Sequence, residues 1–362
     1  MKNYKIAILP GDGIGPEVME QAVRVIEKIE EKFGIKFEKK YGLIWWAAYD
    51  KYQNHFPEET KEICDNVDAV LFASVWGPVD AQDQPKWKDC EKNSILAIRK
   101  YLGLTVNIRP AKVWPALSHL SVLKKDKIPE NGLEIVTFRE LSAGLYFGLH
   151  RTYEENGIKK AQDVCDYDEN TIRHITTFCF EAAKLSGKKI AVVDKANVLD
   201  TSRLWREVVN EVAKSYPEVN FEYVYVDNCA MQLVANPDKY EYILTENLFG
   251  DILSDLTSTF SGSLGLLSSA SFSKTWFGLY EPSGGSAPDI AWKWIANPIA
   301  QILCVAMMLR YSFKEEEAAK AIENAIDETI KDGFRTGDIY RNLEWEKLVN
   351  TKEITDKILK RI

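Results

Sequence analysis

The stretch KIAILPGDGIGPEVMEQAVRVIEKIEEKF, residues 5–33, joins an apolar run to a long segment of helical periodicity through a glycine-rich loop. Pro16 stands near the start of the second segment, where its missing N–H costs nothing, and Glu17 in the first turn complements the helix dipole. The pattern predicts a strand followed by a helix over residues 16–33.

The same alternation recurs further along the chain. DAVLFASV (68–75) has the pattern of another buried strand, and KKIAVVD (188–194) precedes the helical segment TSRLWREVVNEVAKSY (201–216). Repeated alternation of this kind predicts an α/β fold. Because no internal repeat, low-complexity segment or Pro/Gly/Ser-rich linker divides the chain, we expect any second domain to be inserted into the first.

Composition limits the class of protein and its partners. The 362 residues are 46% hydrophobic, which is enough for packed cores, and no stretch reaches the roughly 20 apolar residues of a membrane helix. The N-terminus lacks the apolar core of a signal peptide, so we expect a cytoplasmic protein. A net charge of −8 without a basic stripe argues against nucleic acid and favours a small-molecule partner. The six cysteines and four histidines show no paired metal-ligand spacing.

Two aspartates, Asp251 and Asp255, stand one helical turn apart in TENLFGDILSDLTS (245–258). Like charges at this spacing repel each other, which raises the question of whether a positive group lies between them. Asp227, at the end of the apolar run YVYVDN, offers a third carboxylate, and Mg²⁺ or Mn²⁺ prefers such oxygen ligands. The alternative is that Asp251 caps the helix and Asp255 is solvated.

Three arginines lie at or near the ends of apolar runs: Arg99 in ILAIRK, Arg109 in NIRP and Arg139 in TFRE. Guanidinium groups bind carboxylates bidentately, so three that converge would suit a di-acid or tri-acid. For any one of the three taken alone, we favour the alternative that it is solvated or pairs with a local carboxylate such as Glu140.

Lys195 and Asn197 follow the apolar run of residues 190–194. A lysine at the mouth of a sheet can act as a general base when burial or nearby cations lower its pKa, although a surface lysine is the commoner case. We expect the next helix to be capped by Asp200, Thr201 or Ser202. The loop PGDGIGPEV has GxGxG spacing rather than GxGxxG, so it suits a ligand loop and an ordinary tight turn equally.

Seven segments that occur in order together resemble the β-decarboxylating dehydrogenases, over nearly the whole chain: ILPGDGIGPEV, NIRPAKV, RELSAGLYFG, DKANVLDTSRLWREVV, VDNCAMQL, TENLFGDILSD and GLYEPSGGSAPDIA. The resemblance implies a two-domain α/β fold distinct from the Rossmann fold. Its first domain would comprise residues 1–104 and 262–362, and an inserted domain, 105–261, would carry the contact of a homodimer.

The resemblance also implies NAD-dependent oxidative decarboxylation of (2R,3S)-3-isopropylmalate to 4-methyl-2-oxopentanoate, a step of leucine biosynthesis, in active sites shared between subunits. The carboxylates of the malate would be held by Arg99, Arg109 and Arg139. Tyr146 would be the acid, and the partner's Lys195 the base. The metal, Mg²⁺ or Mn²⁺, would be bound by Asp251, Asp255 and the partner's Asp227, which also contributes to the substrate site.

Two further segments bear on the specificity for substrate and for cofactor. SILAIR places Ile95 and Leu96 where an isopropyl group would be received, and an extra residue in DCEKNS puts in doubt the acidic position of Glu91 near the nicotinamide. In SAPDIA a carboxylate can accept a hydrogen bond from the ribose 2′-hydroxyl, which favours NAD over NADP. The residues expected to bind the cofactor are Ile14, Asn197, Glu281, Gly285, Ser286, Ala287, Pro288, Asp289, Ile290 and Asn297.

Tryptophan replaces glycine of the family pattern at six positions: Trp45, Trp46, Trp76, Trp276, Trp292 and Trp294. Three explanations compete: remodelling around another ligand, a folded but inactive relative, or UGA codons that are read as glycine in some bacterial lineages and written here as tryptophan. We favour the third hypothesis because all six changes are of one kind while the charged set is intact. D-malate, homoisocitrate and isocitrate dehydrogenases, or an inactive dimeric relative, remain the alternative functions.

Overall fold

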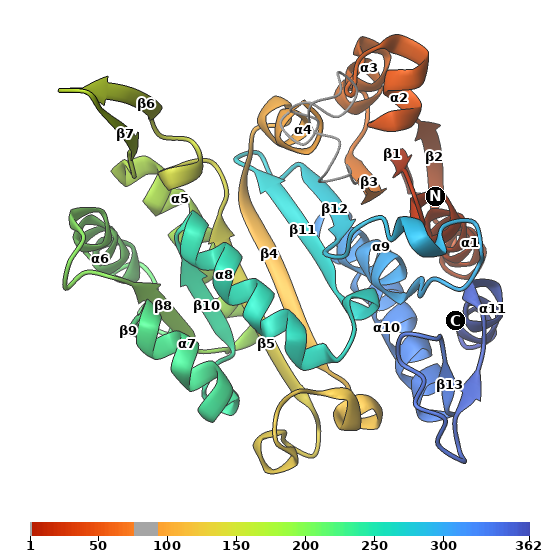
Figure 1. Cartoon of the computed structure of the whole chain (residues 1–362). Helices are drawn as coiled ribbons and strands as arrows, with labels where there is room; N and C mark the ends of the chain where they lie inside the picture. Colours follow the sequence, from red (N-terminus) through yellow and green to blue (C-terminus); the bar gives the residue numbers. More distant parts are fainter. Residues whose placement is uncertain (1, 76–92) are drawn as a thin grey trace. The chain divides into compact units, whose positions relative to one another are not determined.

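The structure is a computed structural model that describes residues 2–75 and 93–362 (Figure 1). The chain forms two compact units. Unit 1 comprises Met1–Gly103, Trp114–Leu120 and Ser261–Ile362, and unit 2 comprises Leu104–Val113 and Ser121–Phe260. Residues 114–120 therefore lie in unit 1, whereas the sequence-based division assigned them to the inserted domain.

Unit 1 alternates strands and helices, as its opening segment predicts. In chain order its elements are β1 (Asn3–Gly11), α1 (Gly15–Phe33), β2 (Lys36–Tyr41), α2 (Trp46–Tyr52), α3 (Glu58–Asp65), β3 (Ala69–Ser74), α4 (Ile95–Tyr101), β11 (Ser268–Ser273), β12 (Gly278–Pro282), α9 (Ile299–Tyr311), α10 (Glu316–Lys331), β13 (Phe334–Arg335), β14 (Lys347–Leu348) and α11 (Thr351–Leu359), with short 3-10 turns at Pro115–Leu120, Leu264–Leu266 and Pro288–Ile290.

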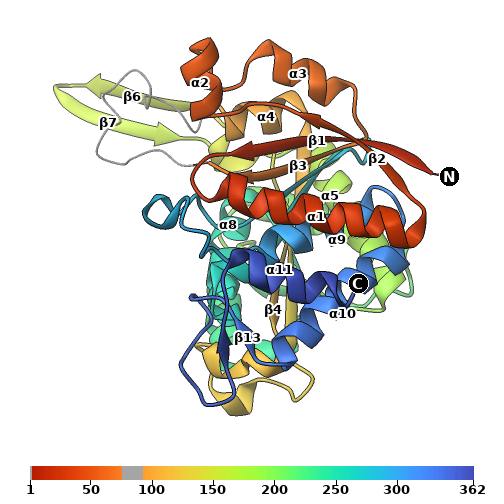
Figure 2. The same ribbon diagram turned by 90° about the vertical axis from the view of Figure 1, so that its right-hand side faces the viewer.

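The main strands of unit 1 pair in the order β2-β1-β3-β12-β11. All neighbours are parallel except β11, which is antiparallel to β12. Helix α9 is apolar on nearly every side and is buried among α1, α10 and the strands, as an all-round hydrophobic helix must be. Figure 2 shows α1 and α11 side by side within this unit.

The backbone of the glycine-rich loop after β1 lies close to the backbone of Ser286. Gly13 has φ +62°, and a Cβ there would lie 2.2 Å from the carbonyl oxygen of Ser286. The next amide, Ile14 N–H, donates to that same carbonyl over 2.8 Å. Glycine is required at position 13 because both the positive φ and the approach to Ser286 exclude a side chain.

Unit 2 contains the remaining elements. They are β4 (Leu104–Val113), β5 (Leu133–Glu140), η4 (Gly144–Tyr146), β6 (His150–Glu155), β7 (Ile158–Asp163), α5 (Glu169–Ser186), β8 (Ile190–Asp194), α6 (Asp200–Ala213), β9 (Phe221–Tyr225), α7 (Val226–Ala235), β10 (Tyr242–Thr245) and α8 (Asn247–Ser258), with short 3-10 turns at Lys125–Lys127 and Pro237–Lys239.

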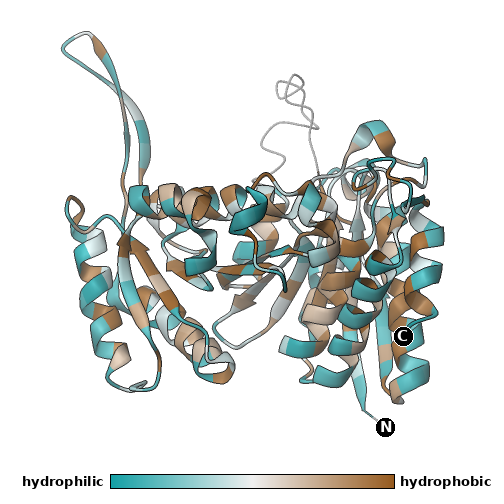
Figure 3. Cartoon of the chain, turned by 90° about the horizontal axis from the view of Figure 1, so that it is seen from below, coloured by the Kyte–Doolittle hydropathy of each residue, from teal (hydrophilic) through white to brown (hydrophobic). Residues whose placement is uncertain are grey.

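The unit 2 strands pair in the order β4-β5-β10-β8-β9, and only β4 and β5 are antiparallel. Its core joins residues of β4, β5, β8, β10, α7 and α8. Strands β6 and β7 form a separate antiparallel hairpin of mostly polar residues, which is visible as a thin two-stranded arm in Figure 3. The mainly parallel strands and the helices of each unit confirm the predicted α/β class.

Helix starts show where local signals succeed and fail. Helix α1 begins at Gly15 with proline in its first turn, in agreement with the predicted 16–33. The predicted cap of α6 is wrong: Asp200 is already helical, Leu199 precedes it, and no side chain caps the helix. Ser202 instead accepts a hydrogen bond from the Lys195 N–H, 3.0 Å away, because that loop turns back onto the helix.

No helix in residues 2–75 and 93–362 has both the length and the apolar character needed to cross a membrane. In the same part of the chain all five cysteines are free thiols. Trp76 and Glu91 lie outside the described residues.

Candidate functional site

The guanidinium of Arg109 lies between the two aspartates of α8. Its Nη1 is 3.5 Å from Asp251 Oδ1 and 3.2 Å from Asp255 Oδ1, and it donates to Ser254 Oγ at 3.0 Å. This positive group explains how two like charges are tolerated one helical turn apart. Asp251 is inside α8 rather than at its start, so the helix-cap alternative is wrong.

Arg139 extends the same cluster. Its Nη1 donates to Asp251 Oδ1 over 2.5 Å, while Nε and Nη2 donate to Asn247 Oδ1 over 3.0 and 2.8 Å. The strand register explains the meeting: Asn107 is paired with Arg139 and Arg109 with Thr137 on antiparallel β4 and β5, so both arginines project from one face. The spacing of Arg109 and Arg139 along the sequence does not indicate that they lie on one face of the sheet.

Tyr146, in the η4 turn, donates its hydroxyl to Asp251 Oδ2 over 2.8 Å. Partial burial, followed by the hydrogen bond to Asp251, raises the pKa of Tyr146 above its ordinary value. The phenol is therefore protonated at neutral pH and is available as a proton donor. Within unit 2 the structure thus brings together Arg109, Arg139, Tyr146, Asp251 and Asp255.

Lys195 and Asp227 form a second, separate pair. Lys195 Nζ is 2.9 Å from Asp227 Oδ2, and both side chains are partly or largely exposed. This hydrogen bond is the main cause of the lowered pKa of the Asp227 carboxyl. Asp227 lies in the first turn of α7 and not on a strand as YVYVDN indicated, because β9 already ends at Tyr225.

The three predicted metal ligands are not gathered by one chain. Among residues 2–75 and 93–362, no three His, Cys, Asp or Glu side chains are grouped closely enough to hold a metal ion. The donor chemistry still suits Mg²⁺ or Mn²⁺, because Asp251 and Asp255 present carboxylate oxygens on one side of α8. A further oxygen ligand would have to come from elsewhere.

Two buried carboxyl groups, Glu140 and Glu246, were not predicted as site residues from the sequence. Glu140 accepts hydrogen bonds from the amides of Ser142 and Ala143. Burial raises the pKa of Glu140, and it raises that of Glu246 to about 7. Glu140 is the last residue of β5 and Glu246 directly follows β10, so their position at the end of an apolar strand is the signal that could have marked them.

In unit 1, Arg99 is held by another predicted site residue. Its Nη2 lies 2.7 Å from Glu281 Oε1, and both side chains are largely buried. Ile95 and Leu96 stand in the first turn of the same helix, α4, and Leu96 is 41% exposed. This helix therefore offers one guanidinium and an accessible apolar surface.

A cavity of about 460 Å³ in unit 1 collects most of the predicted cofactor residues. It is lined by Ile14, Gly285, Ser286, Ala287, Pro288, Ile290 and Asn297. Three predicted members do not line it: Glu281, which binds Arg99, exposed Asp289, and Asn197, which belongs to unit 2.

Asp338 also lines this cavity and was missed. Its Oδ2 accepts from Ser263 Oγ and from Asn297 Nδ2, the latter over 3.0 Å, and Oδ1 accepts from Thr336 Oγ1. A Cβ at Gly265 would lie 2.8 Å from Asp338 Oδ2, so glycine is needed beside it. Mostly apolar walls with few fixed polar groups are typical of a site for a flat heterocycle.

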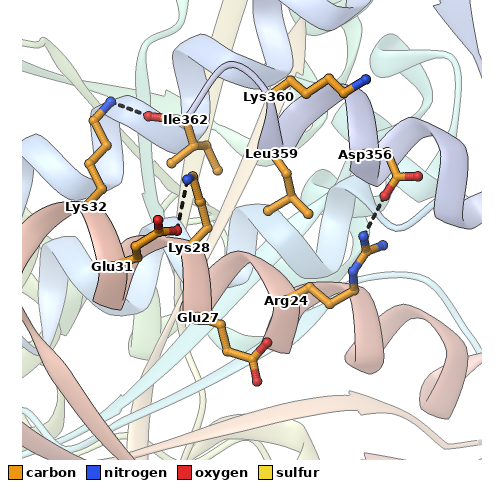
Figure 4. Close-up of a pocket in the computed structure, with 9 residues that line it drawn as sticks. All are labelled: Arg24, Glu27, Lys28, Glu31, Lys32, Asp356, Leu359, Lys360 and Ile362. Atoms are coloured by element: carbon orange, nitrogen blue, oxygen red, sulfur yellow. Dashed lines mark hydrogen bonds and ion pairs between the residues drawn. The ribbon is translucent and has the colours of Figure 1, made fainter.

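Figure 4 shows another cavity, of about 840 Å³, between α1 and α11 of unit 1. Several of its charged residues have partners within the cavity: Arg24 pairs with Asp356, Lys28 pairs with Glu31, and Lys32 donates to the main-chain oxygen of Ile362. No predicted site residue lines it, so we assign it no ligand.

Sequence comparison finds relatives over the whole chain. The profile of the isocitrate/isopropylmalate dehydrogenase family matches residues 5–358. A 3-isopropylmalate dehydrogenase of Aquifex aeolicus is 51% identical over 363 residues, with 100% of this chain and 98% of that protein covered. The corresponding protein of Thermotoga maritima is 51% identical over 358 residues, with 99% of each covered.

Solved structures agree with the sequence relatives. An isocitrate dehydrogenase of Methylococcus capsulatus superposes with a TM-score of 0.84 at 32% identity, covering 99% of both chains. A β-decarboxylating dehydrogenase of Thermococcus kodakarensis, in its apo form, gives a TM-score of 0.81 at 35% identity, covering 99% of this chain and 96% of that one. The predicted fold type is confirmed by these neighbours.

Proposed function

Because the chain belongs to the isocitrate/isopropylmalate dehydrogenase family, we propose that it catalyses the NAD-dependent oxidative decarboxylation of (2R,3S)-3-isopropylmalate to 4-methyl-2-oxopentanoate. The observation that carries this choice of substrate is the identity of 51% over the full chain to relatives named for that reaction. The reaction belongs to leucine biosynthesis, and we expect it to take place in the cytoplasm.

The arginines would bind the two carboxylates of the malate. Arg109 and Arg139 are rigidly placed by Asp251, Asp255 and Asn247, so they lose little freedom when a substrate arrives. Arg99 adds a third guanidinium, and the apolar residues Ile95 and Leu96 of its helix would receive the isopropyl group. An apolar pocket discriminates by only ~1–3 kcal/mol per methylene, so longer or shorter 3-alkyl groups would be weaker substrates and not excluded ones.

Tyr146 and Lys195 would carry the proton transfers. The phenol of Tyr146 keeps its proton at neutral pH, which suits an acid that protonates an enol. The amine of Lys195 would take the hydroxyl proton, and its neighbour Asp227 orients it from 2.9 Å.

Asp251, Asp255 and Asp227 would hold Mg²⁺ or Mn²⁺. A bound divalent cation polarises a carbonyl oxygen and favours the loss of CO₂ from a β-keto acid. Since the described part of one chain groups no three such ligands, Asp227 and Lys195 would come from the partner subunit of a homodimer. Exposed apolar side chains on α7 and α8, among them Met231, Val234 and Ile252, support a surface of this kind.

NAD would bind in the cavity of about 460 Å³, with its adenosine against residues 284–288. The glycine and backbone groups there leave room for a flat ring and a ribose. When bound, NAD would supply the acceptor for the hydride that leaves C2 of the substrate. Asp289, exposed beside this cavity, would disfavour the 2′-phosphate of NADP by like-charge repulsion.

The first test is NAD reduction with 3-isopropylmalate and Mg²⁺, compared with D-malate and isocitrate. Turnover that favours either of the other two acids would overturn the assignment of the substrate, and no turnover with any of them would overturn the enzyme assignment.

The shared site is tested by mixing two inactive variants, Lys195→Met and Asp251→Asn, after dissociation and reassociation. Half of randomly formed dimers are mixed, and each would contain one complete site, so about a quarter of the normal activity should return. No recovery on mixing, although each variant still forms dimers, would contradict a site built from two chains.

A further inference from the structure

Four tryptophans occupy backbone conformations that favour glycine. Within residues 2–75 and 93–362, nine non-glycine residues have positive φ: Trp45, Gln53, Asn156, Trp276, Ala287, Trp292, Trp294, Lys314 and Asn342. Positive φ is rare for non-glycine residues and is a true outlier for bulky ones. The whole chain has only 10 tryptophans among its 362 residues, so four among nine is a strong concentration.

Trp45 is the most restrictive of the four. Its φ of 67° and ψ of −128° lie outside the left-handed helical region, in a part of the map that glycine adopts and side chains avoid. Its side chain is nevertheless fully buried. The backbone is held there by the Trp45 N–H, which donates to the carbonyl oxygen of His55 over 2.8 Å.

Hydrogen bonds of the main chain also hold Trp294 and Trp276 in their positive-φ conformations. The Trp294 N–H donates over 2.9 Å to the carboxylate of Glu17, a residue only 1% exposed on α1. The Trp276 N–H donates to the carbonyl oxygen of Ser273 in a tight turn. These bonds fix the local path, so an unfavourable φ cannot relax without losing them. Trp276 and Trp292 are 46% and 67% exposed, so little burial compensates there.

Three other tryptophans behave differently. Trp114 and Trp205 are 1% and 3% exposed, and Trp205 packs edge-on against Tyr167 at 5.8 Å. Trp345 packs edge-on against His119 and lies beneath the guanidinium of Arg335. None of the three has a positive φ. These seven described tryptophans therefore fall into two classes, one that packs in an ordinary conformation and one that occupies glycine-like conformations.

We propose that the protein made in its native source carries glycine at positions 45, 276, 292 and 294, and that UGA codons read there as glycine have been written as tryptophan. Positions 114, 205 and 345 carry genuine tryptophan. The proposal is independent of the enzyme assignment, because it rests on backbone conformation and packing alone.

The direct test is the mass of peptides from the native protein. Peptides that span positions 45, 276 and 292–294 should have the masses of glycine, whereas peptides that contain residues 114, 205 and 345 should have those of tryptophan. Tryptophan at position 45 or 294 in the native peptides overturns the proposal.

A second measurement compares the printed chain with a variant that has glycine at the two exposed positions, 276 and 292, where no buried side chain is lost. Relief of two unfavourable φ values should raise the midpoint of thermal unfolding by on the order of 2–5 °C. Trp114→Gly and Trp205→Gly are the controls and should lower it, since each empties a buried site. An unchanged or lower midpoint for the twofold variant would count against the proposal.

A different observation, the hydrogen bonding of Asn247, carries a second inference. This side chain is fully buried at the start of α8. Its Oδ1 accepts both Nε and Nη2 of Arg139, and its Nδ2 donates to the carbonyl oxygen of Ala143 over 3.0 Å. Ala143 directly precedes the turn that ends in Tyr146.

Asn247 therefore connects two groups of the site. It occupies one edge of the Arg139 guanidinium and leaves Nη1 directed at Asp251. Gly250 lies against the aliphatic part of the Arg139 side chain, since a Cβ there would lie 2.6 Å from Arg139 Cγ. We infer that Asn247 is a positioning residue that sets the Arg139 guanidinium and the Tyr146 turn in one arrangement; this inference rests on the proposed function.

Two substitutions separate the two connections. Asn247→Ala loses both and should raise KM for 3-isopropylmalate and lower kcat, each about tenfold. Asn247→Asp keeps an acceptor for Arg139 but has no donor for Ala143, so KM should return toward normal while kcat stays low. Asn170→Ala, at an exposed position of α5, is the matched control and should match the unsubstituted enzyme.

Equal changes in both variants, or unchanged kinetics in Asn247→Ala, would overturn the positioning role. If the unsubstituted chain does not turn over 3-isopropylmalate at all, the proposed function has failed instead, and the two failures are thus distinguishable.

Discussion

Lys195 and Asp227 face each other across two neighbouring parallel strands, with Lys195 Nζ 2.9 Å from Asp227 Oδ2. Asp194 at the end of β8 is paired with Tyr225 at the end of β9, so the residues that follow leave the same edge of the sheet. A base and a metal ligand are thereby presented together on unit 2. Helix α8 carries Asp251 and Asp255, the other two proposed ligands of the metal.

Replacement of Lys195 should abolish most turnover. Lys195→Met is expected to lower kcat by ~10²–10⁴-fold with a small effect on KM, because a positioned base acts mainly in the transition state. Steady-state NAD reduction measures both constants. The matched control is Lys189→Met, since Lys189 pairs with Glu222 across the same two strands at their other ends. Equal losses in the two variants would contradict a catalytic role for Lys195.

Removal of a carboxylate from α8 should weaken metal binding. Asp255→Asn is expected to raise the Mn²⁺ concentration for half-maximal activity by at least about 10–100-fold, since the cation loses a charged oxygen ligand. Asp255 is exposed, so the unfolding midpoint should hardly change. Titration with Mn²⁺ and calorimetry of Mn²⁺ binding measure the effect. An unchanged Mn²⁺ requirement would remove Asp255 from the metal site.

Asp289 should control the choice between NAD and NADP. Asp289→Asn removes the repulsion of a 2′-phosphate and an acceptor for the ribose hydroxyl. The ratio of kcat/KM for NAD to that for NADP should fall by roughly tenfold or more. Asp327→Asn, on α10, changes charge equally outside the cavity and should leave the ratio unaltered. A ratio unchanged in Asp289→Asn would refute this role.

Glu246 should make stability fall as pH rises. Burial raises its pKa from 4.5 to about 7 in the folded protein, so between these values the folded state holds a proton that the unfolded state has released. Its stabilising effect is present below about pH 4.5 and is lost as pH rises through 7, with a total on the order of 3 kcal/mol. Glu246→Gln should therefore unfold at a higher temperature than the parent at pH 8.

That difference between Glu246→Gln and the parent should shrink as pH is lowered toward 5. Thermal unfolding across this range measures it, and Glu222→Gln, an exposed glutamate on β9, is the control. A difference that is constant with pH would mean that the carboxyl of Glu246 does not titrate in this window.

The seven family segments, taken together in their order, predicted more of the site residues than any single sequence pattern did. The spacing of Asp251 and Asp255 indicated that a positive group should lie between them but did not identify it. The structure identifies it as Arg109, on a strand 142 and 146 positions away in sequence. Asn247 and Asp338 were missed because their roles depend on partners that converge only in the folded chain. The cap of α6 was misplaced because the polar residue after Leu199 is already helical.

The sequence by itself determined the α/β class, the start of α1 at the Pro16 turn and the family, because periodicity, capping and ordered motifs act over a few residues or accumulate along the chain. Only the tertiary structure decided that Arg109 separates two aspartates, that Glu246 is buried deeply enough to hold its proton, and that Trp45 lies where glycine belongs. Contacts and φ values of this kind depend on strand register and burial, which no local pattern specifies.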